Sequence, residues 1–107
     1  IILGILAAVA VPRYIDLESN AQQRAIDAGI SELNGRESLT WADQKINSTG
    51  YVSDTLTLGL VDTSLGDEYG WSVGPGATGG TLTFKNADAI LDRAPSSVEQ
   101  PAVWTRQ

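Results

Sequence analysis

Apolar residues fill the first eleven positions of the chain, Ile1 to Val11, without one charged or polar side chain. A helix rises about 1.5 Å per residue, so this run covers only about half of a bilayer's hydrocarbon core, which takes roughly 20 apolar residues. A signal peptide would show a small-residue cleavage site next, whereas Pro12-Arg13-Tyr14 follows and leads into a polar helical pattern. A core helix that is apolar all round is typical of larger proteins. We therefore expect the second half of a longer membrane segment that begins upstream.

Two residues weaken a helix in this stretch. Pro12 has no N–H group and its ring crowds the carbonyl of Ala8, while Gly4 lowers helix stability two turns earlier. The sequence therefore predicts a helix that is kinked or partly unwound around Gly4–Pro12.

From Tyr14 to about Ile46 the apolar residues recur at spacings of three, four or seven, which predicts a long amphipathic helix. One stripe is formed by Leu17, Ala21, Ala25, Ala28, Gly35, Leu39, Ala42 and Ile46. A second stripe on roughly the opposite face is formed by Ile15, Ile26, Ile30, Leu33 and Trp41. Two stripes indicate contacts on both sides. We expect the alanine-rich upper part to pack on other helices and the lower turns, Leu33 to Ile46, to pack on a sheet; the alternative is that the exposed alanines reflect helix propensity alone.

A polar connection follows the helix. Asn47-Ser48-Thr49-Gly50 predicts the helix end, and its match to the N-glycosylation triplet is interpreted as chance. Within 51–70, Leu56, Leu58 and Leu60 alternate and predict a short strand. The acidic residues between Asp62 and Glu68 lack the spacing of a calcium-binding hand, so a solvated loop is favoured over a calcium site.

The last third predicts a small antiparallel sheet, with strands near 71–73, 81–85, 89–93 and 102–106 separated by turns rich in Gly, Pro, Ser and Asn. The fold class is therefore α+β: a long N-terminal helix packed on three to four antiparallel strands. The projecting half of the helix is 1–24. The globular head is 25–107, with the lower helix, the connection 47–70 and the sheet 71–107. The predicted head core is Leu33, Leu39, Ala42, Ile46, Leu82, Phe84, Ile90 and Trp104.

The order of residues in the opening segment resembles the N-terminal segment of type IV pilins and of type II secretion pseudopilins. The resemblance lies in Gly4-Ile5-Leu6-Ala7-Ala8-Val9-Ala10-Val11-Pro12 and the following Arg13-Tyr14. The glycine-rich turn, hairpin and closing Val103-Trp104-Thr105-Arg106 strand also resemble small bacterial pilins. The family's methylated aromatic terminus and its early glutamate are not among these residues. Many pilins close a C-terminal loop with a disulfide, which a chain without cysteine cannot form.

Composition narrows the chemistry. The chain has no cysteine and no histidine, so a thiol nucleophile, an imidazole proton shuttle and the common soft metal ligands are missing. The formal net charge of −6 disfavours general nucleic-acid binding, and no direct nucleic-acid site is evident. Asp88 and Asp92 could form an acid–base pair, but solvated surface carboxylates are the favoured interpretation. We expect no enzyme, no cofactor and no metal site.

The resemblance implies a structural subunit of a type IV pilus-like filament that forms a helical homo-oligomer by bundling N-terminal helices. Its implied partners are the pilus or secretion assembly machinery and the inner membrane before assembly, and its implied location is the bacterial cell surface as a fimbrium. Adhesion, motility and DNA uptake are not distinguished. The expected filament-core residues are Ile1, Ile2, Leu3, Ile5, Leu6, Val9, Val11, Leu17, Ala21, Ala25 and Ala28, with unwinding around Gly4 and Pro12 in the filament. The alternatives are a type II secretion pseudopilin and, from another class, a membrane-anchored ligand-binding module.

Overall fold

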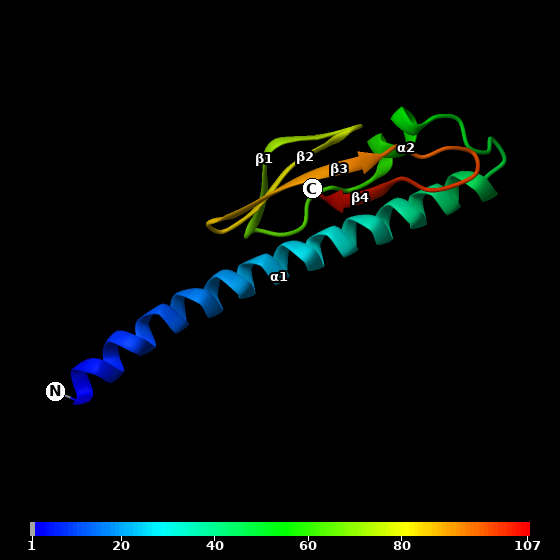
Figure 1. Ribbon diagram of the computed structural model, residues 1–107. Helices are drawn as coiled ribbons and strands as arrows, with labels where there is room; N and C mark the ends of the chain where they lie inside the picture. Colours follow the sequence, from blue (N-terminus) through cyan, green and yellow to red (C-terminus); the bar gives the residue numbers. More distant parts are fainter. Residues whose placement is uncertain (1) are drawn as a thin grey trace.

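The computed structural model of the chain describes residues 18–107 with their side chains, and helix α1, Ile2–Ile46, extends upstream of them. The predicted irregularity around Gly4–Pro12 falls in a stretch where the backbone of α1 is helical throughout. The side chains of the predicted helix-packing residues from Ile1 to Leu17 lie outside the described residues. A four-stranded antiparallel sheet packs on one side of α1, in an α+β layout that confirms the predicted fold class (Figure 1). A short helix, α2, Asp54–Leu60, lies beside the C-terminal end of α1.

Helix α2 replaces the strand that was predicted from the alternation of Leu56, Leu58 and Leu60, and that prediction is wrong. The side-chain oxygen of Ser53 accepts a hydrogen bond from the Leu56 N–H at 3.2 Å, and Asp54 lies in the first turn. An N-cap serine followed by an acidic residue favours a helix start. Thr57 is fully buried, so this turn packs toward the interior instead of presenting alternating faces.

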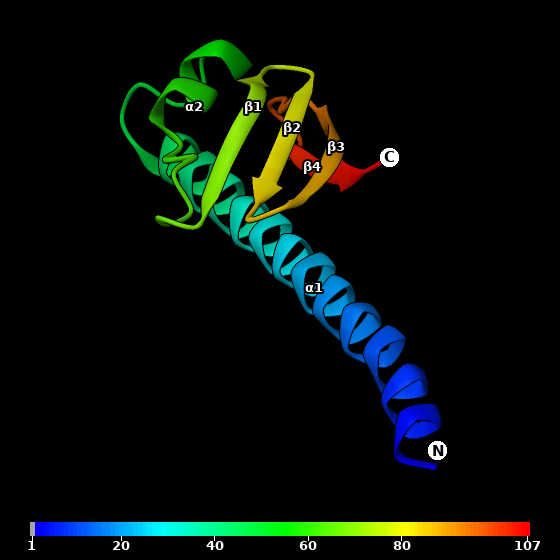
Figure 2. The ribbon, with the colours of Figure 1, turned by 90° about the vertical axis from the view of Figure 1, so that its left-hand side faces the viewer.

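The sheet has the strand order β1-β2-β3-β4, with β1 at Tyr69–Gly76, β2 at Gly79–Phe84, β3 at Ala87–Ala94 and β4 at Val103–Arg106. All neighbouring strands are antiparallel, and Thr81 of β2 lies opposite both Val73 of β1 and Ile90 of β3. Figure 2 shows the strands on one side of α1 and the helix running past them toward the N-terminus. Described residues Glu18 to Ala21 are exposed, so the head covers α1 only from about residue 22 onward.

The core lies between the sheet and the face of α1 that carries Ile26, Ile30 and Leu33, all buried. The predicted second stripe of the helix therefore faces the sheet, and the sheet packs higher on α1 than predicted. Of the lower turns, Leu33 to Ile46, only the first part contacts the sheet, through Leu33, Asn34 and Glu37. Further along, the Trp41 indole N–H donates to the Ser97 carbonyl, in the segment before β4, at 2.8 Å. The core cluster is Ile26, Ile30, Leu33, Leu82, Ala87, Ala89, Leu91 and Trp104.

Three residues of the predicted head core are in fact exposed: Leu39 (66%), Ile46 (82%) and Ile90 (56%). At about 100° per residue, Leu39 lies about 180° around α1 from Ile30, so it faces away from the sheet. Ile90 is exposed because β3 buries Ala87, Ala89, Leu91 and Arg93, and a shift of one residue along a strand reverses the face. Leu33, Leu82 and Trp104 are buried, and Ala42 and Phe84 are half-buried.

Candidate functional site

The side of α1 that faces away from the sheet carries small and apolar residues. Ala21, Ala28, Gly35, Leu39 and Ile46 are all exposed, and they recur at spacings of seven or four. These five residues form the free face of α1. Figure 1 shows the strands and α2 gathered on one side of the helix, the side on which Ile26, Ile30 and Leu33 are buried. A helix with an apolar stripe on each of two opposite sides has one stripe left uncovered by its own head.

Only some of the predicted helix-packing residues lie on the free face. Ala21 and Ala28 belong to the free face, whereas Ala25 is half-buried and its carbonyl accepts a hydrogen bond from the Tyr69 hydroxyl at 2.7 Å. Ala25 therefore lies at the edge of the head. The other predicted filament-core residues, Ile1 to Leu17, lie upstream of the described part.

Three ionised side chains lie on or beside the free face, Arg24, Glu32 and Asp43, and all three are exposed. Three acids of α1 have partners within the molecule: Glu32 with Arg36 (3.0 Å), Asp27 with Arg106 (3.5 Å) and Glu37 with Arg93 (2.8 Å). Among residues 18–107, neither Arg24 nor Asp43 forms an ion pair. Their charges are therefore open to a partner from outside the described chain.

A buried ion network fixes α1 to the head. The guanidinium of Arg93, on β3, donates to Glu37 of α1 through Nε (2.8 Å) and Nη2 (3.2 Å). It donates to Asp54 of α2 through Nη1 (2.8 Å) and Nη2 (2.9 Å), and to the Ala77 carbonyl through Nη1 (3.1 Å). All five N–H groups of the guanidinium therefore have acceptors. The network connects three elements that are far apart in the sequence.

The remaining oxygens of the two acids are also satisfied. The Trp104 indole N–H donates to Glu37 at 3.0 Å, and the backbone N–H and hydroxyl of Ser96 both donate to Asp54, at 2.8 and 2.7 Å. Burial raises the pKa of Asp54, but the hydrogen bonds from Arg93 and Ser96 outweigh it and lower that pKa from 3.8 to about 2. Burial likewise disfavours the charge of Arg93, yet Asp54 and Glu37 raise its pKa above the ordinary value. Both groups therefore stay ionised at neutral pH.

Sequence reasoning did not predict this network, because residues 37, 54 and 93 belong to three separate elements. One signal was present: Arg93 occupies an inward position of β3, after Ala87, Ala89 and Leu91. A charged residue in the buried phase of a strand requires a buried partner of opposite charge.

The loop between Asp62 and Glu68 is held by a cation of the chain itself. The Arg36 guanidinium donates through Nη1 to the carbonyls of Asp62 (2.7 Å) and Ser64 (2.9 Å), and the Asp62 carboxylate accepts from the Ser64 N–H. Within the described residues, no group of three or more carboxylates, His or Cys has a metal-binding arrangement. The carbonyls of Asp62 and Ser64, which could otherwise bind a metal cation, therefore already accept hydrogen bonds from Arg36.

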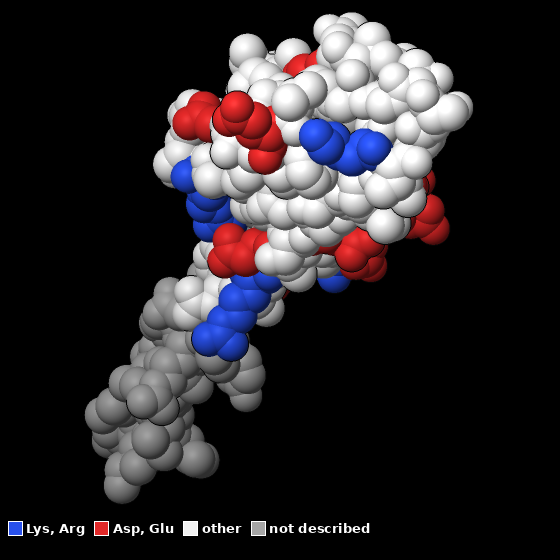
Figure 3. Space-filling model, turned by 90° about the vertical axis from the view of Figure 1, so that its right-hand side faces the viewer, with Lys and Arg blue, Asp and Glu red and all other residues white. Residues whose placement is uncertain are grey.

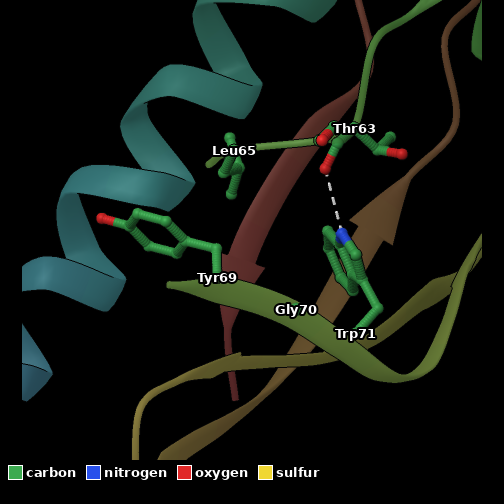
Figure 4. A pocket seen from close by; sticks show the side chains of 6 residues that line it. Thr63, Leu65, Tyr69, Gly70 and Trp71 are labelled. Carbon is green, nitrogen blue, oxygen red and sulfur yellow. Dashed lines mark hydrogen bonds between the residues drawn. The ribbon is translucent and has the colours of Figure 1, made fainter. Parts of the chain in front are cut away.

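A small cavity of about 240 Å³ lies between this loop and β1, lined by Thr63, Ser64, Leu65, Tyr69, Gly70 and Trp71. Figure 4 shows the Trp71 indole directed at the Thr63 carbonyl, to which it donates a hydrogen bond of 3.0 Å. The Tyr69 ring separates the cavity from α1. Ligand pockets usually measure about 300–1,000 Å³ and contain polar groups free to bind, and this cavity is smaller and has its indole N–H already bonded.

The two acids that were considered as an acid–base pair, Asp88 and Asp92, lie exposed on the outer side of β3, and Asp92 accepts a hydrogen bond from Gln107 at 2.7 Å.

Figure 3 views the molecule from the end at which α1 meets α2, and much of the head surface there is uncharged. Leu56 and Leu60 of α2 are exposed large apolar residues, at 45% and 57%.

In the part of the chain that the structure describes, no helix is both long and apolar enough to cross a membrane. Comparison of the sequence with protein-family models and with curated proteins, and of the structure with solved structures, found no match.

Proposed function

We propose that this chain is a structural subunit of a type IV pilus-like extracellular filament, in which copies assemble by packing their long N-terminal helices together. The single observation that carries the proposal is the free face of α1, which the head leaves uncovered on the side opposite the core. Leu39 and Ile46 on this face are 66% and 82% exposed. Burying apolar surface gains about 25 cal/mol per Å², so covering this face with other copies favours assembly.

The opening run supports the same function. Ile1 to Val11 has no polar side chain, and such a segment requires lipid or other apolar segments around it. We propose that it is held in the inner membrane before assembly and among the helices of other copies afterwards, with an assembly machinery moving it between the two. The order of glycine and alanines within this run, followed by Pro12, is the basis of the resemblance to pilins and pseudopilins. The mature location would be the bacterial cell surface.

The head supports a structural role for a physical reason. Its buried charged groups, Arg93 and Glu37, and the half-buried Asp54 are bonded to one another and to neighbouring groups, so they are not available for catalysis. The cavity beside Trp71 is small, and its indole N–H and the Tyr69 hydroxyl are already bonded within the chain, which favours a filament subunit over a ligand-binding module.

Two exposed apolar residues provide a matched test. Leu39 on the free face and Val73 on the outer side of the sheet are similarly exposed, at 66% and 62%. We expect Leu39→Asp to abolish fibres recovered by shearing cells, because it places a carboxylate in the helix contact, while Val73→Asp leaves fibres at the wild-type level. Equal fibre yields from the two variants would contradict assembly through α1. A wild-type chain that stays monomeric in mild detergent and forms no fibre on cells would favour the binding module.

A further inference from the structure

The two ends of the free face of α1, on either side of Glu32 and Gly35, have the same residue spacing and complementary side chains. The lower half has two large apolar residues seven positions apart, Leu39 and Ile46, with Asp43 between them. The upper half has two small residues seven positions apart, Ala21 and Ala28, with Arg24 between them. If the lower half of one copy is placed against the upper half of a second copy, large side chains face small ones and a carboxylate faces a guanidinium.

Two nearly equal displacements align the three pairs. A shift of 18 residues places Leu39 opposite Ala21 and Ile46 opposite Ala28, and a shift of 19 places Asp43 opposite Arg24. At about 1.5 Å per residue these shifts are about 27 and about 28.5 Å, which differ by less than an arginine side chain can span. Small residues at the contact also let two helices approach closely, as in ridges-into-grooves packing.

We propose that two copies of this chain pack in parallel through the free faces of their α1 helices, displaced by 18 to 19 residues, with Asp43 of one copy paired to Arg24 of the other. The second copy is the occupant for two reasons. Arg24 and Asp43 have no ion-pair partner among residues 18–107, and their charges are complementary to each other. This contact rests on the proposed function and names the surface through which the filament assembles.

The same residues also align in an antiparallel pair, with Ala21 opposite Ile46 and Arg24 opposite Asp43. That arrangement has two-fold symmetry and closes as a dimer, with the Ile1–Val11 runs at opposite ends. A parallel, displaced contact is heterologous and does not close: it leaves one half of the face on each copy for a further copy. It also keeps the apolar runs at the same end, where one membrane holds them. The parallel contact therefore follows from the proposed function.

The absence of native cysteine allows a direct test by disulfide cross-linking in assembled fibres. The full-length chain with Ala21→Cys and Leu39→Cys should give a ladder of linked copies on a non-reducing gel after mild oxidation. Each single variant should give at most a dimer. The matched control, Ala21→Cys with Ile46→Cys, reports the antiparallel arrangement and should give no linkage.

A charge exchange tests the pair independently. Arg24→Asp and Asp43→Arg should each greatly reduce fibre yield, because each places like charges together, and the double exchange should restore the wild-type yield. The thermal melting temperature of the chain in detergent should stay at the wild-type value in all three, since both residues are exposed.

The outcomes separate this contact from the proposed function. Wild-type fibres without a 21–39 linkage, a 21–46 linkage of equal or greater efficiency, or a double exchange that fails to restore fibres would each overturn the contact and leave the filament standing. A wild-type chain that forms no fibres at all would overturn the proposed function as well.

Discussion

The side-chain amide of Asn34 pairs with both backbone groups of Trp104 on the outer edge of β4. Asn34 Oδ1 accepts from the Trp104 N–H at 2.7 Å, and Asn34 Nδ2 donates to the Trp104 carbonyl at 3.0 Å. The two bonds reproduce what a neighbouring strand would make, so a residue of α1 occupies the last open position beside the sheet. Open strand edges invite pairing with other chains, and this one is blocked at its centre.

Replacing Asn34 by alanine should therefore cost about 1–3 kcal/mol, because two backbone groups of Trp104 lose their partners in a partly buried place. The measurement is the free energy of unfolding from urea titration of the full chain in mild detergent. Ser38→Ala, an exposed change one turn further along α1, is the control and should stay within about 0.5 kcal/mol of wild type. A loss no larger for Asn34→Ala than for Ser38→Ala would show that the edge contact contributes nothing.

The buried network predicts a larger effect at Arg93. Arg93→Met leaves the carboxylates of Glu37 and Asp54 without their cation, and breaking a buried pair in this way costs about 3–5 kcal/mol. Arg106→Met removes the more exposed pair with Asp27 and a long hydrogen bond to the Gln23 carbonyl, and we expect a loss of about 0–1 kcal/mol. Adding Glu37→Met to Arg93→Met should recover part of the stability, because an unpaired buried charge is removed. Similar losses for the two arginine variants would contradict a structural role for the network.

The Asp54 carboxylate predicts a pH dependence. Its pKa is lowered from 3.8 to about 2 in the folded chain, so it contributes stability above about pH 4. That contribution disappears as the pH falls through about 2. The difference in unfolding free energy between wild type and Asp54→Asn should be constant at neutral pH and shrink between pH 4 and pH 2. Thr55→Ala, an exposed change in α2 that removes no ionisable group, is the control, and its difference from wild type should not change with pH over this range. A pH-independent difference for Asp54→Asn would contradict the assigned pKa.

Two glycines of α1 should respond to alanine in opposite directions. A Cβ at Gly29 would lie 3.1 Å from the Tyr69 ring and 3.2 Å from Leu65, whereas nothing lies within 4 Å of a Cβ at Gly35. Gly35→Ala should stabilise the monomer by about 0.5–1 kcal/mol, the usual gain for alanine over glycine in a helix. At Gly29 the crowding should cancel that gain, and the larger Gly29→Leu should destabilise by about 1–3 kcal/mol. Equal gains from alanine at both positions would show that the sheet does not pack closely on this turn.

The sequence pattern predicted the architecture because a spacing of apolar residues that repeats along a whole helix or strand remains recognisable even when single positions deviate from it. The three- and four-residue spacing down to Ile46 predicted a helix end that α1 reproduces, and the alternation near Leu82 predicted β2. It was harder to predict which face of each helix or strand is buried. Leu39 and Ile46 have the hydrophobicity of core residues, and only the position of the sheet on α1 decides that they are exposed. At Ile90 one residue of register was enough to reverse the prediction.

The residues that hold the head together left a weaker trace in the sequence. The ion network forms only when the folded chain brings together Glu37, Asp54 and Arg93. No local spacing in the sequence relates these three residues. Ser53 and Asp54 did carry a helix-start signal, which the alternation of three leucines obscured. The sequence predicted only the upper half of the candidate site. The part of the stripe with Ala21 and Ala28 was predicted to contact other helices, but its lower half was assigned to the core of the head.

The most direct test of the account is electron microscopy of the fraction sheared from the surface of cells that make the full-length protein, with peptide identification of its main band. We expect thin helical fibres whose principal component yields peptides of this chain, such as the stretch from Ala25 to Arg36. Cells that release no fibre containing this chain, and a full-length product that is freely soluble without lipid or detergent, would contradict a filament built on the helix α1.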